Sequence, residues 1–345
     1  MKQRITYIDQ LKGIAIILVV IGHFIQYNTI AAKDSGLFSF IYSFHMPLFM
    51  FISGYVAFKT TKVTIFESYG NFLLKKARSL LVPFFAWPLI VDNFVFRSDL
   101  NFDFYNRALL LLADPRIGLW FLWYLFFLTV IFSAFLFLSM RFNRKNKLFF
   151  DATICIFLSL FLLLVKFLGN LIYIDGFIQY FGYFFLGVFL AKYSAIRDRI
   201  LNVNYFSLLF VIFLVAVGHY SFNDKNFHMF GVSLLIKVVA ATTAIFSLYY
   251  IVNNIKWIPV IDSYITSWGV SSIVIYATHF KFIEIFKGIG LLPEMHVLLL
   301  LVISLLFSLL VVSFCMFIYR IVKLCPPLNF LLYGQKLEFY INKIK

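Results

Sequence analysis

Residues 11–30 read LKGIAIILVVIGHFIQYNTI, and residues 37–58 read LFSFIYSFHMPLFMFISGYVAF. Each stretch has the length of about 20 mostly apolar residues that a helix needs to cross a bilayer. The rest of the chain is similar, because 63% of its 345 residues are hydrophobic, 13% are charged and the mean hydropathy is +0.93. Soluble domains have about 25% charged residues. The composition therefore excludes a soluble globular protein and predicts an all-α, polytopic integral membrane protein.

We predict about ten transmembrane helices, one in each long apolar run. They cover roughly residues 11–30, 37–58, 79–96, 117–140, 148–168, 173–191, 204–220, 229–252, 268–288 and 296–320. The third run contains Pro83 and Pro88, which membrane helices tolerate where neighbours satisfy the freed carbonyl groups. A short amphipathic helix is expected at residues 99–112. Because no internal repeat or soluble segment is visible, residues 1–345 are predicted to form a single membrane domain.

The distribution of positive charge predicts the orientation of these helices. Twenty-one of the 30 Lys and Arg residues lie on one side, near the N-terminus, in or beside alternate loops, or near the C-terminus. The opposite loops hold six, namely Lys33, Arg97, Arg107, Arg116, Lys225 and Lys287. Cytoplasmic loops are enriched in Lys and Arg, so both termini are expected in the cytoplasm. This topology signal also explains the net charge of +15, and no nucleic-acid partner is expected.

The cysteines predict neither a disulfide framework nor a metal site. Cys155, Cys315 and Cys325 are widely separated, and each lies in or beside an apolar run. Paired spacing is what disulfide-rich and zinc-binding sequences show. We therefore expect packing or lipid-facing roles for these residues, and no metal.

Ionisable residues inside the predicted spans are candidate site residues, because an unpaired polar group in hydrocarbon is costly. At about 1.5 Å per residue, His23 and His279 lie roughly 18 Å and roughly 16–17 Å from the cytoplasmic end of their helices. His45 and Lys237, on descending helices, lie roughly 12 Å from the outer end. In a core of about 30 Å these depths coincide, which predicts one polar cavity. The alternative is separate interhelical hydrogen bonds that only hold helices together.

Further polar residues accompany these four. Gln26 follows His23 by three residues and shares its helix face. Asp9 is placed either to cap the first helix or to act in catalysis. Ser53 and the adjacent Gly54 permit close approach of another helix, and Ser53 is expected to line the cavity.

A basic cluster is expected at the cytoplasmic mouth of this cavity. Lys75, Lys76 and Arg78 fall in the predicted loop after the second span. The bias of cytoplasmic loops explains part of this charge. Such a cluster also binds phosphate groups or an anionic lipid surface.

Five stretches of the chain resemble the acyltransferase 3 family of membrane proteins. They are RITYIDQLKGIAIILVVIGH (residues 4–23), SFHMPLFMFISG (43–54), KKARSLLVPF (75–84), LWFLW (119–123) and YATH (276–279). The nearest likeness is to the fucose 4-O-acetylase-like branch and to polysaccharide O-acetyltransferases. The resemblance covers nearly the whole chain and implies a bacterial cytoplasmic (inner) membrane protein.

The resemblance assigns roles to individual residues. The family's catalytic histidine falls on His23, and its basic residue eleven positions earlier, usually arginine, is Lys12 here. The family's Arg-x-x-Arg pair appears as Lys75-x-x-Arg78. Trp120 lies in a shorter motif and is expected to line the cavity, as is His279.

The expected activity is transfer of an acyl group from cytoplasmic acyl-CoA, most simply acetyl-CoA, to a hydroxyl of a surface polysaccharide or lipid-linked glycan. His23 would act as general base, because a hydroxyl is a weak nucleophile until its proton is removed. His45 would orient the acceptor or relay the proton, with Asp9 as a further catalytic candidate. The donor phosphates would bind Lys12 and the basic cluster at residues 75–78.

Other partners and functions remain open at this point. Expected partners are the glycan acceptor, acyl-CoA and membrane lipid, together with a second copy of the chain or proteins of polysaccharide biosynthesis. A transporter or flippase for a glycan or lipid-linked intermediate also suits many spans around a polar cavity. A membrane-bound sensor or assembly partner of a polysaccharide synthase is the third alternative. Consumption of acetyl-CoA distinguishes the first function from the other two.

Overall fold

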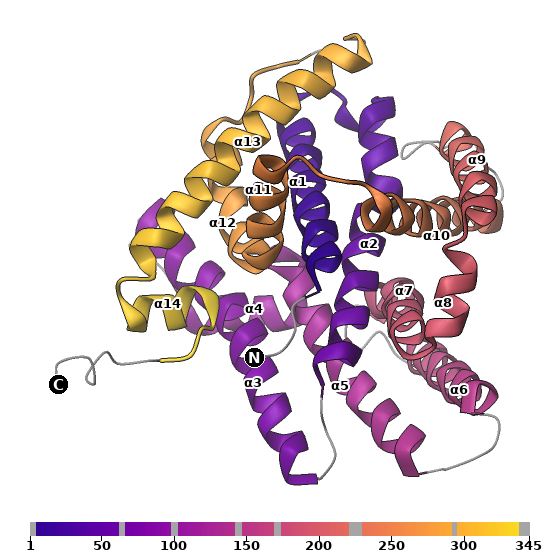
Figure 1. Ribbon diagram of the computed structural model, residues 1–345. Coiled ribbons are helices and arrows are strands. Elements are labelled where there is room, and N and C mark those ends of the chain that lie inside the picture. Colours follow the sequence, from indigo (N-terminus) through magenta and orange to yellow (C-terminus); the bar gives the residue numbers. More distant parts are fainter. Residues whose placement is uncertain are drawn as a thin grey trace. The chain divides into compact units, whose positions relative to one another are not determined.

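Figure 1 shows the protein as a computed structural model, which describes residues 5–61, 66–97, 103–141, 147–168, 174–220, 230–291 and 295–337. These residues form helices joined by short connections, and no strand occurs among them. One isolated β-bridge pairs Thr29 with Leu291. The prediction of an all-α protein is confirmed.

Contacts divide the chain into two compact units, each made of two separate stretches. The first unit is Met1–Val56 with Phe189–Tyr319, and the second is Ala57–Val188 with Arg320–Lys345. The boundaries fall inside three continuous helices, α2 (Gly36–Thr60), α7 (Ile174–Lys192) and α13 (Val297–Val322).

Each unit contains a distinct set of helices. The first holds α1 (Thr6–Asn28), the 3-10 helix η1 (Ala32–Asp34), most of α2, α8 (Ser194–Ile200), α9 (Val203–His219), α10 (Phe230–Asn254), α11 (Pro259–Val270), α12 (Ser272–Ile285) and most of α13. The second holds α3 (Phe66–Ala86), the π-helix η2 (Trp87–Arg97), α4 (Phe104–Ala113), the 3-10 helix η3 (Pro115–Ile117), α5 (Trp120–Arg141), α6 (Lys147–Leu168), most of α7 and α14 (Pro326–Tyr333).

Within the described residues, six helices are long and apolar enough to cross a membrane: α1, α2, α5, α6, α10 and α13. The helices α8 and α9, inclined by 68° at their junction, make a seventh if they form one span. The predicted spans at 79–96 and 173–191 coincide with helical residues that are not among these seven, apart from residue 173, which lies outside the described residues. The prediction of one continuous helix at 268–288 is wrong, because α11 ends at Val270 and α12 begins at Ser272 and ends at Ile285. The spanning helices make the chain an integral membrane protein.

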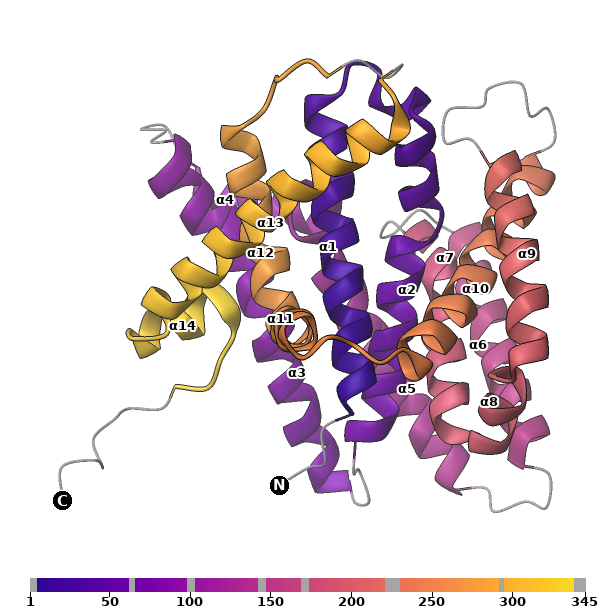
Figure 2. The same cartoon turned by 45° about the horizontal axis from the view of Figure 1, so that its top comes forward.

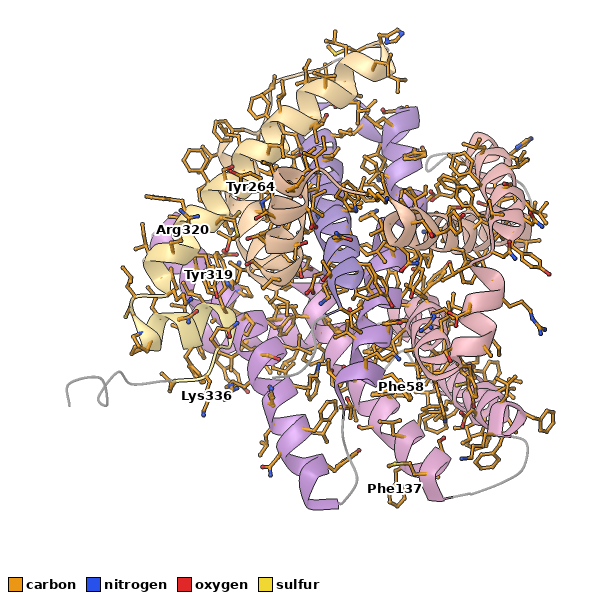
Figure 3. The ribbon with its side chains drawn as sticks, in the orientation of Figure 1. Phe58, Phe137, Tyr264, Tyr319, Arg320 and Lys336 are labelled. Atoms are coloured by element: carbon orange, nitrogen blue, oxygen red, sulfur yellow. The ribbon has the colours of Figure 1, made fainter. Side chains whose placement is uncertain are left out.

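The surface of the spanning helices is apolar, as a lipid environment requires. In α6, the side chains of Phe157 and Phe167 are 68% and 87% exposed. Figure 3 shows Phe137 projecting from α5, where its side chain is 48% exposed. Each exposed Å² of apolar surface costs about 25 cal/mol in water, whereas lipid removes this cost. A helix satisfies most of its backbone groups internally, which suits such an environment.

In the first unit, α1 is packed against α11 through two glycines. Figure 2 shows α11 end on beside the length of α1, so that the two helices cross steeply. A Cβ atom on Gly13 would overlap the carbonyl oxygen of Ile265, and one on Gly269 would overlap that of Asp9. Small residues at such crossings let membrane helices approach closely. This contact fixes the N-terminal half of α1 against α11.

The C-terminal end of α1 is held by the segment that follows α12. The Ile30 amide donates to Leu291 O over 2.8 Å, and the Leu291 amide donates to Asn28 O over 2.7 Å. The buried Asn28 side chain also accepts from the Ile289 amide over 3.3 Å. Gly290, with a φ of +76°, permits the turn that brings this segment back. We name these contacts the α1–291 clasp.

In the second unit, the indole of Trp87, the first residue of η2, donates to Leu332 O over 2.9 Å and joins η2 to α14. The short helix expected at residues 99–112 is present as α4, whose N-cap Asp103 accepts from the Asn106 amide over 3.1 Å. Residues 98–102 lie outside the described part of the chain.

Candidate functional site

His23 on α1 is held by a hydrogen-bonded chain that reaches α2. Its Nδ1 lies 3.1 Å from Gln26 Oε1, and the same oxygen accepts from the Tyr42 hydroxyl over 2.7 Å. An amide oxygen only accepts hydrogen bonds, so Nδ1 of His23 is the protonated nitrogen. In a neutral ring Nε2 then carries the lone pair. His23 can therefore accept a proton at Nε2.

His279 on α12 lies beside His23. The two ring centroids are 5.3 Å apart, with the planes inclined by 37°. Nδ1 of His279 is 3.0 Å from Ile275 O and 2.8 Å from Tyr276 O. Those carbonyls fix the ring on the preceding turn of its own helix. Phe280, next in sequence, packs edge-on against His23 with centroids 5.9 Å apart.

His45 on α2 is the third imidazole of the group. Its Nδ1 lies 2.8 Å from Ile41 O, and its ring centroid is 4.7 Å from that of Tyr42. His23 and the ammonium group of Lys237, on α10, both interact electrostatically with His45. The structure thus brings His23, His45, His279 and Lys237 together within the first unit. In the described residues, no three His, Cys, Asp or Glu side chains are placed to hold a metal ion.

Tyr42 is a site residue that the sequence analysis missed. It precedes His45 by three residues and so shares that histidine's helix face, which was the available signal. Gly22 makes room for it, since a Cβ atom there would lie 3.0 Å from Tyr42 Cε2. The pair Gly22-His23 therefore serves two purposes: the glycine admits the tyrosine that holds Gln26, and Gln26 in turn holds the histidine.

Asp9 and Lys12 form an ion pair on the first turns of α1. Lys12 Nζ is 3.1 Å from Asp9 Oδ1, and the carboxylate side chain is 9% exposed. Helix α1 begins at Thr6 with Ile5 as an N-cap that lacks a side-chain hydrogen bond. The interpretation of Asp9 as the helix cap is therefore wrong, because the helix starts three residues before it. Asp9 instead balances the charge of Lys12.

A second carboxylate lies near this pair in the same unit. Asp262 on α11 accepts from the Gln10 amide over 2.6 Å and from the Thr266 hydroxyl over 3.1 Å. This contact links α1 to α11 next to the glycine crossing. Asp262 lies outside every predicted span and was not predicted as a site residue.

Lys75, Lys76 and Arg78 belong to the second unit and lie within helix α3, which begins at Phe66. The prediction of a loop at these positions is wrong, because Lys and Arg are good helix formers and continue the helix. Lys75 is exposed, and Lys76 lies 5.7 Å from the Phe72 ring centroid. Gly334 packs against the backbone of Arg78, and a side chain at position 334 would clash with that backbone.

The remaining two predicted residues occupy different units. Ser53 lies on α2 in the first unit and is half-buried. Trp120 opens α5 in the second unit and stacks on Tyr180, with ring centroids 5.6 Å apart. The Tyr180 contact gives Trp120 a packing role within its own unit.

Three tyrosines and an arginine form a further polar cluster in the first unit. The Tyr7 and Tyr55 hydroxyl oxygens are 2.8 Å apart, and the Tyr249 hydroxyl donates to Tyr7 over 3.0 Å and to Tyr55 over 3.4 Å. Arg197 on α8 donates to the Tyr55 hydroxyl over 3.3 Å. This tyrosine cluster ties together α1, α2, α8 and α10. Sequence reasoning missed it, because its members are far apart in the chain.

Comparison with known proteins assigns the chain to a family. Residues 5–320 match the acyltransferase domain that defines the acyltransferase 3 family. The chain therefore belongs to the acyltransferase 3 family of membrane proteins. The predicted resemblance is confirmed.

Two relatives share part of the chain. The nodulation protein NolL of Sinorhizobium fredii is 39% identical over 140 residues, which are 38% of this chain and 37% of that protein. The nodulation protein NolL of Mesorhizobium japonicum is 35% identical over 120 residues, which are 33% of this chain and 31% of that protein. The matched stretches thus span about a third of these relatives. No solved structure matches the chain.

Proposed function

We propose that the protein transfers an acyl group, most simply acetyl, from cytoplasmic acyl-CoA to a hydroxyl of a surface polysaccharide or lipid-linked glycan. The observation that carries the proposal is the chain Tyr42–Gln26–His23, which holds one imidazole with Nε2 available in a family of acyltransferases. We further propose that ten spans place both termini in the cytoplasm of a bacterial inner membrane.

His23 supplies the general base. As the acceptor oxygen bonds to the thioester carbonyl carbon, its proton passes to Nε2 of His23, and Gln26 Oε1 holds the Nδ1–H. The carbon–sulfur bond then breaks, and the proton on Nε2 neutralises the departing thiolate. Positioned general bases of this kind contribute about 10²–10⁴-fold in rate.

Lys12 in the first unit is one proposed contact for donor phosphates, and the basic residues of α3 in the second unit are proposed, separately, for the same role. Lys12 presents a point charge and already balances Asp9, so that a bound phosphate would share this lysine with the carboxylate. Lys75 and Arg78 lie three residues apart on one face of α3. His45 and Lys237 would line the acceptor side, with Asp9 acting through Lys12.

The test is acetyl-CoA consumption by the purified full-length protein in detergent, compared with His23→Ala and with His219→Ala. His219 lies exposed at the end of α9 and is the matched control. We expect His23→Ala to lose activity by about 10²-fold or more, and His219→Ala to retain it. Retained activity in His23→Ala would overturn the base assignment. No consumption by the wild-type protein would favour the transporter alternative.

A further inference from the structure

His279 carries a buried nitrogen that has no partner among the described residues. The side chain is 2% exposed, and Nε2 is buried without a hydrogen bond. Buried polar atoms in folded proteins are nearly always hydrogen-bonded, so an exception needs an explanation. Because none of the described residues supplies this partner, a bound molecule can supply it.

The missing group is a hydrogen-bond donor. Nδ1 of His279 faces two carbonyl oxygens, Ile275 O and Tyr276 O, and these only accept. Nδ1 therefore carries the proton of the neutral ring, and Nε2 presents a lone pair. A doubly protonated ring would place an unpaired positive charge in a buried site, which is costly.

His23 cannot supply this donor. Its own proton is engaged at Nδ1 by Gln26, so its Nε2 is also an acceptor. The neighbouring rings, 5.3 Å apart between centroids, therefore present two acceptors and no donor to each other. A molecule with two adjacent hydroxyl groups satisfies both nitrogens.

We propose that His279 Nε2 accepts a hydrogen bond from a second hydroxyl of the acceptor, so that the protein acts on diols with hydroxyls on neighbouring carbons. This inference rests on the proposed function and narrows its substrate class. The first hydroxyl loses its proton to His23 as its oxygen forms the ester bond. The second keeps its proton, donates it to His279 and remains a free hydroxyl in the product.

Phe280 suits the same acceptor. Its half-buried ring lies 5.9 Å from the His23 ring between centroids, in an edge-to-face arrangement, and adds an apolar surface next to that histidine. Pyranose rings have C–H faces that pack on aromatic side chains, while their hydroxyls turn toward polar groups. An acceptor carried by a sugar ring would use both features.

The experiment compares two small probes with the purified full-length protein and acetyl-CoA. The probes are cis-1,2-cyclohexanediol and cyclohexanol, and the readout is the ester formed from each. We expect wild-type kcat/KM to favour the diol by at least about 10-fold, because a site that hydrogen-bonds a hydroxyl rejects an analogue without it. His279→Leu should reduce this ratio to near one, and His279→Gln should restore part of it through its side-chain oxygen. His219→Ala should keep the wild-type ratio.

The outcomes separate this proposal from the proposed function. Equal wild-type activity with both probes, no transfer to the diol in spite of acetyl-CoA hydrolysis, or an unchanged ratio in His279→Leu overturns diol recognition alone. If His279→Leu and His279→Gln lose both esters to the same extent, His279 acts as the base, and diol recognition by His279 is overturned as well. Absence of any acetyl-CoA turnover by the wild-type protein removes the proposed function, and this proposal with it.

Discussion

The imidazole rings of His23 and His279 lie 5.3 Å apart between centroids, although the two residues are more than 250 positions apart in the sequence. Their partners make them different. His23 is held by the side chain of Gln26, whereas His279 is held by backbone carbonyls of its own helix. Side-chain substitutions can therefore change the orientation of His23 while leaving that of His279 in place.

Gln26→Leu and Tyr42→Phe should each lower kcat for acetyl-CoA turnover. Both changes weaken the support of His23 Nδ1–H without removing the base, so the loss should be smaller than the roughly 10²–10⁴-fold expected for His23→Ala. Because Tyr42 acts through Gln26, the double substitution should cost little more than Gln26→Leu alone. Additive losses would show that Tyr42 acts independently of Gln26.

Lys12→Met should raise KM for acetyl-CoA by about 10-fold with a smaller change in kcat, because the lysine would bind the donor phosphates equally in the ground and transition states. Steady-state kinetics with varied acetyl-CoA measures this effect. Lys256→Met is the matched control, since Lys256 is exposed in the connection between α10 and α11. An unchanged KM in Lys12→Met would limit Lys12 to balancing Asp9.

Gly13→Ala and Gly269→Ala should each destabilise the protein by about 1–3 kcal/mol or more, because the new methyl group meets backbone atoms of the partner helix. Thermal unfolding in detergent measures the loss. Gly218→Ala on α9 is the control: it has open space around it, and alanine favours a helix by about 1 kcal/mol. If all three variants unfold at the same temperature, the α1–α11 contact is looser than described.

Tyr55→Phe should reduce thermal stability by about 1–3 kcal/mol, since it removes the hydroxyl to which Tyr7, Tyr249 and Arg197 are all hydrogen-bonded. Tyr264→Phe on α11 is the comparison, as this side chain is 59% exposed and is labelled in Figure 3. An equal effect of the two substitutions would mean that the tyrosine cluster adds no stability.

The sequence predicted the features that follow from composition and local pattern. The apolar runs predicted helices and a membrane environment. The positions of His23, His45 and His279 along their helices predicted that these three residues lie at a similar depth in the membrane. Tyr42 was not predicted, because its contact with Gln26 depends on how α1 and α2 pack. The break between α11 and α12 was not predicted for a similar reason. Gly269 packs directly against the Asp9 carbonyl of α1, and this contact between distant residues is not visible in the sequence.

The basic residues of α3 illustrate a different limit. Lys75, Lys76 and Arg78 were placed in a loop because positive charge marks the ends of membrane spans. Positive charge indicates on which side of the membrane a segment lies, but it does not terminate a helix. The third span was predicted to begin at residue 79, whereas helix α3 begins at Phe66.

The α1–291 clasp has a consequence for the spacing of the two histidines. Backbone hydrogen bonds at Ile30 and Leu291 and the glycine crossing at Gly13 hold α1 to α11 and to the segment after α12. The 5.3 Å spacing of His23 on α1 and His279 on α12 is therefore set by contacts that other residues make. A substitution at either histidine leaves these contacts in place, so its effect on activity reports the loss of the imidazole itself.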